Sequence, residues 1–390
     1  MACREGERFG FLREVPLRTS ASSAVQTFLR NNQPRRPQTR AGACFRRATP
    51  LLGMFICMLM ASAATAVNAQ SGNLRIYWVD TEGGAATLIV TPSGQSLLAD
   101  SGNPGSDDRD AKRIFETART AGLKKIDYLL TTHFHSDHVG GAPALAKLIP
   151  IDKFYDHGDS IETADPRAAQ LWEAYKAVSQ GKRVILKPGD KIPLRGVDVT
   201  VISSDGEVIA PRTKGMQNPS CKDAVSKAED KTENGRSLGF LLTYGKFKFL
   251  DLGDLTWDRE MSLACPMNRI GRVTLFQATH HGFYNDASGA PAFVWGIQPQ
   301  VVVVNNGATK GLAANAYDTL SRIQGLEAIW QSHRSVRNDE AHNTSESMIA
   351  NLGQTPAECR GLSLRASISR DGKFVLTNSR NDFSKTYTAR

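Results

Sequence analysis

Thr131-Thr132-His133-Phe134-His135-Ser136-Asp137-His138-Val139-Gly140-Gly141 is the stretch around which this chain is organised. It holds three of the eight histidines of the chain and one Asp within six residues. The preceding residues 126–130, apolar except for Asp127 and the half-polar Tyr128, predict a buried strand that leads into a loop. His133 and His135 alternate, so an extended backbone points both side chains the same way. Gly140-Gly141 predicts a turn into the next helix.

The residue types of this loop indicate a metal site. Neutral imidazole and carboxylate are the ligands that zinc takes where a coordination position stays open for catalysis. His133, His135, Asp137 and His138 are therefore the first candidate ligands. The alternative is a polar loop with accidental histidines, and the concentration of histidine in one short stretch argues against it.

Two later strands end in further metal-ligating residues. A hairpin over residues 238–252 turns at Gly245-Lys246 and leads to Gly253-Asp254. A strand over residues 272–278 leads to Thr279-His280-His281-Gly282. Strands interleave with helices along the rest of the chain, which by itself supports an α/β fold with a large sheet content.

The motif resembles the H-x-H-x-D-H signature of the metallo-β-lactamase superfamily. The resemblance runs from about Leu74 to the end, and within the superfamily it is greatest to the hydrolase domain of ComEC-type DNA-uptake proteins and to secreted phosphorylcholine-esterase-like members. It implies an αββα sandwich of two mixed β-sheets flanked by helices. It also implies two metal ions, zinc by default, with manganese or iron as alternatives.

The resemblance gives the other residues of the site their roles. Asp254 corresponds to a carboxylate that bridges two metal ions, and either His280 or His281 corresponds to the last metal ligand. The other histidine of that pair would lie beside the metals or face the substrate. Asp100, in Asp100-Ser101-Gly102, corresponds to a residue that orients the metal loop by hydrogen bonds; an ordinary turn aspartate is the alternative.

One departure from the family pattern concerns the first metal site. Many members have a third His about twenty residues before the bridging Asp, where this chain has Glu233-Asn234-Gly235. Asn234 would ligate weakly or hold a water, and His157 is either a substitute ligand or a strand-end residue near the pocket. His333 and His342 either approach the pocket rim, where they would touch an anionic substrate, or are solvated loop histidines.

These features favour a metal-dependent hydrolase in which a metal-activated hydroxide attacks the substrate. Asp137 and Asp254 are the candidate catalytic carboxylates, and Asp137 is also a candidate proton acceptor. The Gly-Asp and His-His-Gly motifs resemble phosphodiesterase and nuclease-like members, so the expected bond is a phosphoester, in particular a phosphodiester, and the expected partner is a small-molecule or phosphoester substrate. A carboxylic ester, lactone or β-lactam hydrolase is one alternative, and a non-catalytic metal- or ligand-binding module on the same fold is another.

Charge and hydropathy separate the first 69 residues from the rest. This part contains ten Arg and three Glu, so the remaining chain has 38 basic and 36 acidic residues although the whole carries +9. The near-neutral remainder predicts no strong nucleic-acid surface. Residues 1–50 are expected to be a disordered leader or the product of a start codon placed too far upstream. Residues 51–69 predict a signal peptide cleaved before Gln70, and residues 70–390 the hydrolase domain.

The signal peptide implies an exported protein, periplasmic or secreted, with no further membrane-spanning segment; an uncleaved anchor is the alternative. The exported part keeps Cys221, Cys265 and Cys359. In an oxidising compartment this odd number allows one disulfide and one free thiol. The sequence does not select the pair.

Overall fold

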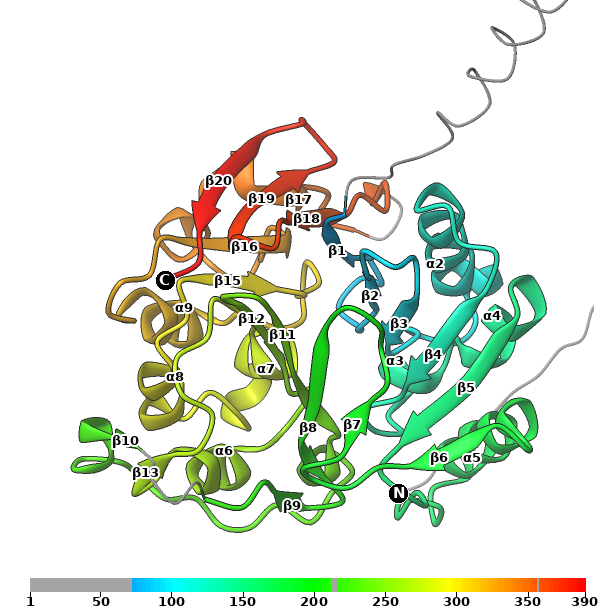
Figure 1. Ribbon diagram of the computed structural model, residues 1–390, viewed down its shortest axis with the longest axis horizontal. Coiled ribbons are helices and arrows are strands. Elements are labelled where there is room, and N and C mark those ends of the chain that lie inside the picture. Colours follow the sequence, from blue (N-terminus) through cyan, green and yellow to red (C-terminus); the bar gives the residue numbers. More distant parts are fainter. Residues whose placement is uncertain (1–71, 212–215, 356–357) are drawn as a thin grey trace, which may run out of the picture. The chain divides into compact units, whose positions relative to one another are not determined.

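The computed structural model describes residues 72–211, 216–355 and 358–390. Two nine-stranded sheets pack against each other with helices on their outer faces (Figure 1). The predicted αββα sandwich is confirmed. The leader and the signal peptide lie outside the described residues, so these two assignments stay predictions.

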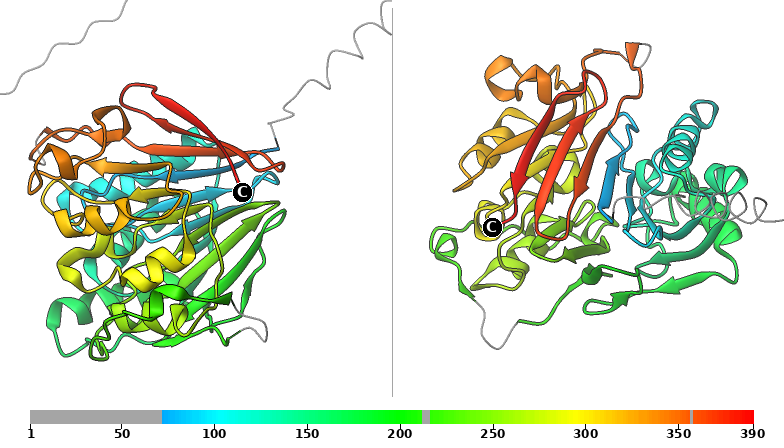
Figure 2. Two further views of the ribbon diagram at one scale, coloured as in Figure 1. Left: turned by 90° about the vertical axis from the view of Figure 1, so that its left-hand side faces the viewer. Right: turned by 45° about the horizontal axis from the view of Figure 1, so that its top comes forward.

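The first sheet has the order β20-β19-β18-β1-β2-β3-β4-β5-β6. Its strands from β3 to β6 are parallel and the others antiparallel, and Figure 2 shows the C-terminal strands β18–β20 continuing the sheet beside β1. The strand bounds are β1 Leu74–Trp78, β2 Thr87–Val90, β3 Ser96–Ala99, β4 Ile126–Leu130, β5 Ile151–Asp156, β6 Arg183–Ile185, β18 Leu364–Ile368, β19 Lys373–Asn378 and β20 Ser384–Thr388.

The second sheet has the order β17-β16-β15-β14-β12-β11-β8-β7, with β9 paired to β8. Its strands from β12 to β17 are parallel, whereas β11, β8 and β7 are antiparallel. The bounds are β7 Lys191–Ile192, β8 Asp198–Ser204, β9 Glu207–Val208, β11 Gly239–Tyr244, β12 Phe247–Asp251, β14 Leu275–Gln277, β15 Val301–Val304, β16 Ala328–His333 and β17 Ile349–Asn351. A separate pair joins β10 (Met216–Gln217) to β13 (Met267–Asn268).

Helices close both outer faces of the sandwich. On the first sheet lie α2, α4 and α5, and on the second lie α6, α8 and α9 (Figure 1). Their bounds, with those of two short helices at the site, are α2 Arg109–Thr120, α3 Ser136–Val139, α4 Ala142–Leu148, α5 Pro166–Ser179, α6 Trp257–Ala264, α7 Thr279–Phe283, α8 Pro291–Ile297 and α9 Ala314–Ser321. One apolar core fills the space between the sheets, and one more lies under each helical layer.

Strand β4 shows why a carboxylate fits inside a buried strand. Parallel neighbours β3 and β5 cover both of its edges, so its residues are almost entirely buried. Asp127 is tolerated there because its Oδ2 accepts hydrogen bonds from the backbone N–H of Ser96, at 2.9 Å, and from the Ser96 hydroxyl. The strand ends at Leu130, and the metal loop follows directly.

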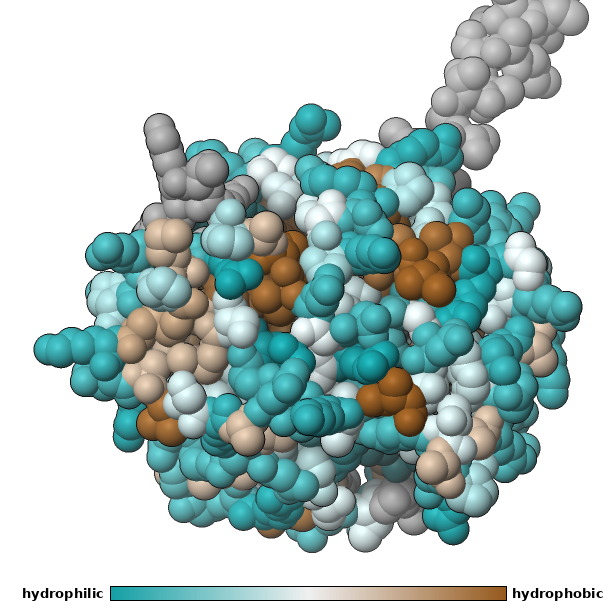
Figure 3. Space-filling model, turned by 90° about the horizontal axis from the view of Figure 1, so that it is seen from below, coloured by the Kyte–Doolittle hydropathy of each residue, from teal (hydrophilic) through white to brown (hydrophobic). Residues whose placement is uncertain are grey.

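Residues 205–235 form a segment rich in polar side chains. Within its described part, a disulfide joins Cys221 to Cys265, which follows α6, so this segment is tied to the helical layer of the second sheet. Cys359 is the free thiol of the described residues. The molecular face in Figure 3 is mainly hydrophilic, and its apolar residues form small separate groups. No helix among the described residues is long and apolar enough to cross a membrane.

Candidate metal centre

The metal loop runs from the end of β4 through α3, and backbone contacts hold it in place. Asp100 accepts the backbone N–H of Thr132 at 2.8 Å, and the carbonyl of Asp137 accepts the N–H of Ala85 at 3.0 Å. A Cβ on Gly141 would lie 2.0 Å from the carbonyl oxygen of Ser101. The second glycine of the motif is therefore needed for close packing of the loop against the end of β3.

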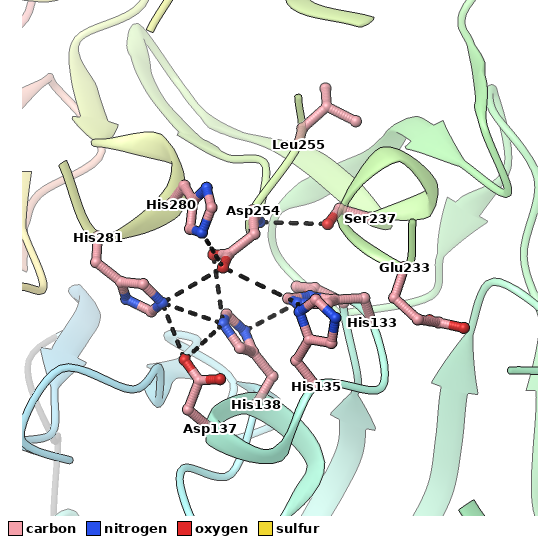
Figure 4. Close-up of polar contacts among 12 residues, drawn as sticks. His133, His135, Asp137, His138, Glu233, Ser237, Asp254, Leu255, His280 and His281 are labelled. Atoms are coloured by element: carbon pink, nitrogen blue, oxygen red, sulfur yellow. Dashed lines mark hydrogen bonds and ion pairs between the residues drawn. The ribbon is translucent and has the colours of Figure 1, made fainter. Parts of the chain in front are cut away.

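Four side chains, here called the metal cluster, converge at the ends of β4, β12 and β14: Asp137, His138, Asp254 and His281. Their ligand atoms all lie within 4.8 Å of one another. His138 Nε2 is 3.3 Å from Asp254 Oδ1 and 3.2 Å from His281 Nε2, and His281 Nε2 is 3.1 Å from Asp137 Oδ2 (Figure 4). Two imidazole nitrogens and two carboxylates thus face a common point.

His133 and His135 form a second group on the other side of Asp254 (Figure 4). His133 Nε2 is 3.0 Å from His135 Nδ1 and 3.9 Å from Asp254 Oδ2. The remaining nitrogen of His135, Nε2, lies 3.1 Å from Glu162 Oε2. Asp254 therefore faces both groups of histidines.

The His280-His281 segment has an unusual backbone. His280 and His281 have φ values of 52° and 56°, and Gly282 follows with 89°. Non-glycine residues in this left-handed region each cost about 1–3 kcal/mol, and such strain clusters at functional sites. Hydrogen bonds from the N–H of His280 to the carbonyl of Gly253 and from the N–H of Leu312 to the carbonyl of His281 hold the turn.

The sequence left open which histidine of the pair joins the cluster. The structure places His281 Nε2 among the metal-cluster atoms, whereas His280 Nε2 contacts Asp254 Oδ2 at 3.3 Å. His281 is 1% exposed and His280 8%, and the ring of His280 lies beside that of Tyr284. His281 is therefore the better-placed ligand candidate, and His280 lies nearer the opening.

Asp254 is fixed by the turn that precedes it. Gly253 has a φ of 56°, and a Cβ there would lie 2.7 Å from the Cβ of Thr132, so both backbone conformation and space select glycine. The Ser237 hydroxyl accepts the N–H of Asp254 at 3.3 Å. The predicted Gly-Asp turn after β12 is confirmed.

Burial and mutual charge set the protonation of the cluster. Burial raises the pKa of Asp254, but the neighbouring histidines, His138 first, outweigh it and hold that pKa well below its usual value. The pKa of Asp137 is lowered for the same reasons. Burial lowers the pKa of His133 well below its ordinary value, and lowers that of His280 to about 4. Metal binding needs ionised carboxylates and neutral imidazoles; these carboxylates and the rings of His133 and His280 fit that requirement, whereas the carboxylates around His138 raise its pKa, so His138 must lose a proton to bind a metal.

Asp100 contacts a histidine of the metal cluster, and His157 contacts a glutamate that binds the backbone of the metal loop. Asp100 Oδ2 lies 2.7 Å from His138 Nδ1, the position expected of an orienting carboxylate. His157 Nε2 lies 3.0 Å from Glu233 Oε2, which also accepts the N–H of Phe134 between the two metal-loop histidines. His157 therefore contacts Glu233 and makes no contact with the metal cluster.

The remaining predicted residues lie apart from the cluster. Asn234 is in a 3₁₀ turn, Asn234–Arg236, where its Oδ1 is buried without a hydrogen-bond partner among the described residues. His333 is buried, with Nε2 2.7 Å from Asp80 Oδ1, and His342 pairs with Asp339 in a surface loop. Neither His333 nor His342 has a hydrogen bond or ion pair with the metal cluster, so their contact with a substrate stays a prediction.

Two residues of the site were not found from the sequence. Lys310, in the loop after β15, forms an ion pair with Asp137 Oδ2, and its side chain is 30% exposed. Glu162 accepts the backbone N–H of Glu233 while it faces His135. The available signal for Lys310 was its place after an apolar strand, because the carboxyl ends of parallel strands gather ligand-binding residues.

Residues 79–216 match the model of a family described as the metallo-beta-lactamase superfamily. The matched range contains the first metal motif but ends before Asp254 and His281. A UPF0173 metal-dependent hydrolase of Cupriavidus necator is 35% identical over 112 residues, which are 25% of this chain and 35% of that protein. One of Polynucleobacter asymbioticus is 26% identical over 219 residues, 52% of this chain and 66% of that protein. The chain thus matches about a third of the first relative and just under two thirds of the second.

A further UPF0173 metal-dependent hydrolase, of Anaeromyxobacter sp. (strain K), is 25% identical over 66% of this chain and 83% of its own length. Among solved structures, the metallo-beta-lactamase fold protein YhfI of Bacillus subtilis has a TM-score of 0.40 at 12% identity, over 66% of this chain and 95% of its own. The particular likeness to ComEC-type and phosphorylcholine-esterase-like members stays a prediction.

Proposed function

We propose that this chain is a metal-dependent hydrolase of the metallo-β-lactamase superfamily that acts on phosphoester bonds. The observation that carries the proposal is the convergence of Asp137, His138, Asp254 and His281 at one point. The relatives named above are called metal-dependent hydrolases, which supports the same reaction class.

The donor set fits metal ions of the zinc type. His281 Nδ1 has no hydrogen-bond partner among the described residues, and His138 Nδ1 is bound to Asp100, so both rings present Nε2 to the cluster. We assign one ion to Asp137, His138, His281 and Asp254, and a second to His133, His135 and Asp254. The second set is smaller, so it is expected to bind its metal more weakly. Manganese and iron are alternatives to zinc.

When bound, such ions supply Lewis-acid activation of water and of the scissile group. The chain's own residues position the reaction. Asp137 contributes a carboxylate oxygen that can also accept a proton. Lys310 reaches Asp137 from the partly exposed side, where its ammonium group can hold an anionic oxygen of the substrate.

Lys310 is also the reason to favour a phosphoester over a neutral ester. A phosphodiester keeps a negative charge on its non-bridging oxygens, and a cation next to the reacting centre stabilises the additional charge of the transition state. A neutral carboxylic ester or lactone would gain less from this ammonium group while in the ground state. The geometry thus supports an anionic substrate.

Export to an oxidising compartment is a further part of the proposal. The apolar run 51–67 and the small residues before Gln70 are typical of a signal peptide. The Cys221–Cys265 disulfide supports the same location, because disulfides persist in oxidising compartments. N-terminal sequencing of the protein from the periplasm and the medium tests it, and an uncleaved protein in the cytoplasmic fraction would contradict it.

The decisive experiment measures metal content and hydrolysis of bis-p-nitrophenyl phosphate for the wild type and for Asp254→Ala. We expect one to two metal ions per wild-type chain, and loss of both metal and activity in the variant. Asp205→Ala, which removes an exposed aspartate outside the cluster, is the control and should keep both. If the protein binds metal and hydrolyses carboxylic esters but not phosphate esters, it belongs to the alternative class of carboxylic ester, lactone or β-lactam hydrolases. Neither metal nor turnover would leave a non-catalytic binding module.

A further inference from the structure

A basic pocket of about 400 Å³ lies at the ends of β12 and β14 opposite to the metal cluster. Lys246, Lys248, Arg272 and Arg390 line it, together with Gln298, Gln300 and Gln324. None of its lining residues is Asp or Glu. Lys248 lies near the start of β12 and Asp254 lies in the turn after its end, so the two sites are at opposite ends of this strand, with these two residues at most roughly 20 Å apart.

The register of the sheet explains how the pocket is built. Phe249 pairs with Leu275, and Leu275 with Val301, so Lys248, Thr274 and Gln300 are side by side at the starts of three neighbouring parallel strands. Backbone hydrogen bonds from Thr274 to Lys248 and from Gln300 to Thr274 confirm this alignment. Lys246, Arg272 and Gln298, each two residues earlier and outside the strands, line the same pocket. Further along these strands the same side is apolar and packed under helices.

Three of the four cations that line the pocket have no ionic partner among the described residues. Lys246, Lys248 and Arg272 have no ion pair and no side-chain hydrogen bond with any described residue, whereas Arg390 is paired with Glu327. Three cations held around one hollow repel one another, and an anion bound between them removes that repulsion. Arginine and lysine together are typical binders of phosphate groups.

Gln300 adds a requirement on the ligand. Its side chain is 4% exposed, and its Nε2 donates to Glu327 Oε1 and to the carbonyl of Thr388. Its Oε1 is buried without a partner among the described residues. A buried acceptor without a donor is costly, so a ligand that brings a hydroxyl group would improve the pocket. The pocket volume lies within the range of small-molecule sites.

From these observations we propose that this pocket binds a phosphorylated small molecule that carries hydroxyl groups, with the phosphate between Lys248 and Arg272 and a hydroxyl near Gln300. A sugar phosphate and a nucleoside monophosphate share this chemistry. The site is separate from the metal cluster, so the proposal stands whether or not the chain hydrolyses phosphoesters.

Isothermal titration calorimetry of the full chain with glucose 6-phosphate, AMP and inorganic phosphate tests the proposal. We expect one site besides any binding at the metal cluster, with one of the two esters binding to it more tightly than inorganic phosphate. Lys248→Gln and Arg272→Gln should each weaken this binding at least about 10-fold, the effect of one lost charge-assisted contact. Asp254→Ala, which disables the metal cluster, should retain it, and Lys153→Gln, at an exposed lysine on β5, is the matched control.

Each of the other outcomes overturns part or all of the proposal. Absence of binding at millimolar concentrations, or equal effects of Lys153→Gln and Arg272→Gln, would overturn the site. Binding that is lost in Asp254→Ala but kept in Arg272→Gln would place the anion at the metal cluster instead. Equal affinity for inorganic phosphate and both esters would overturn the role assigned to Gln300. Which ester binds more tightly distinguishes a sugar phosphate from a nucleotide.

Discussion

Nδ1 of His138 lies 2.7 Å from Oδ2 of Asp100, and this contact turns Nε2 of the same ring toward Asp254 at 3.3 Å. Asp100 also accepts the backbone N–H and the hydroxyl of Thr132, so one buried carboxylate fixes both the metal loop and the His138 ring. The strong burial of His138 lowers its pKa, but the carboxylates of Asp254, Asp100 and Asp137 outweigh it and raise that pKa well above the usual value. Without a metal ion the His138 ring therefore holds a second proton, and a metal ion must displace a proton to bind Nε2.

Asp100→Asn should weaken metal binding about 10- to 100-fold while the protein stays folded, because carboxylates behind metal-bound histidines contribute affinity of this size. Asparagine suits the left-handed backbone of this position, where φ is 63°. Competition with a fluorescent chelator measures the affinity. Asp107→Asn, also at a left-handed position but fully exposed, is the control and should bind as the wild type does. Unchanged affinity in Asp100→Asn would contradict the orienting role.

Removal of the Cys221–Cys265 disulfide should destabilise the protein. The two cysteines are 44 residues apart. Closing a loop of that length in the unfolded chain corresponds to roughly 4 kcal/mol in the chain-entropy model, and losses of 2–5 kcal/mol are typical. Urea unfolding of Cys221→Ser with Cys265→Ser measures the loss. Cys359→Ser leaves the disulfide intact and should unfold near the wild-type midpoint. A double variant as stable as the wild type would show that the bond contributes nothing.

The sheet strands and the residues of the metal cluster were largely predictable because their signals are local. The apolar runs before Thr131, Gly253 and Thr279 end in the polar residues of the site, and strand ends are where such residues gather. The short helices α6 and α8 and the polar edge strand β20 were missed. Helices of seven or eight residues give too few turns for a periodic pattern, and β20 is too polar and exposed to be recognised as a strand.

Side-chain pairing between distant segments was not predictable. His333 was a candidate for the pocket rim or a solvated loop, and the structure instead buries it against Asp80, 253 residues earlier. His157 was a candidate substitute ligand, and only the fold brings Glu233 to it. Lys310 carries no motif, and its contact with Asp137 spans 173 residues. Such pairs depend on how loops from different strands meet, which no spacing in the sequence records.

Glu260 should make stability depend on pH. This residue of α6 is fully buried, and it accepts the backbone N–H groups of Gly289 and Ala290 with one oxygen. Burial raises its pKa to about 8. The folded state therefore binds a proton that the unfolded state has released, and stability falls as pH rises from about 5 toward 8.

Glu260→Gln keeps the acceptor oxygen and removes the ionisation. Between pH 6 and pH 8 the wild type should lose roughly 2 kcal/mol more than this variant. Urea unfolding at both pH values measures the difference, and a remaining slope is expected from Asp251, whose pKa burial raises to about 7. Glu116→Gln makes the same change on the surface of α2 and should follow the wild type. Parallel curves for Glu260→Gln and the wild type would show that Glu260 is ionised throughout.

Lys310 should matter for charged substrates and little for neutral ones. Its ammonium group is the cation that contacts the metal cluster in the described structure, and it is 30% exposed beside the ring of Tyr284. A charge-assisted contact to a substrate anion contributes about 1.5–3 kcal/mol, equivalent to roughly 10- to 150-fold in rate. At saturating metal, Lys310→Ala should therefore lower kcat/KM for bis-p-nitrophenyl phosphate by at least about 10-fold.

The same variant should change hydrolysis of p-nitrophenyl acetate by less than about threefold, since that ester has no charge for Lys310 to hold before attack. Lys310→Arg keeps the positive charge and should recover part of the diester activity, and Lys153→Ala controls for the loss of a surface lysine. Metal content measured on each variant separates the two roles that the position allows. If Lys310→Ala lowers both activities equally and also lowers metal content, Lys310 supports Asp137 and does not hold the substrate. If only diester hydrolysis falls and the metal content is unchanged, the ammonium group selects an anionic substrate. The ion pair of Lys310 with the partly exposed carboxylate of Asp137 predicts this result.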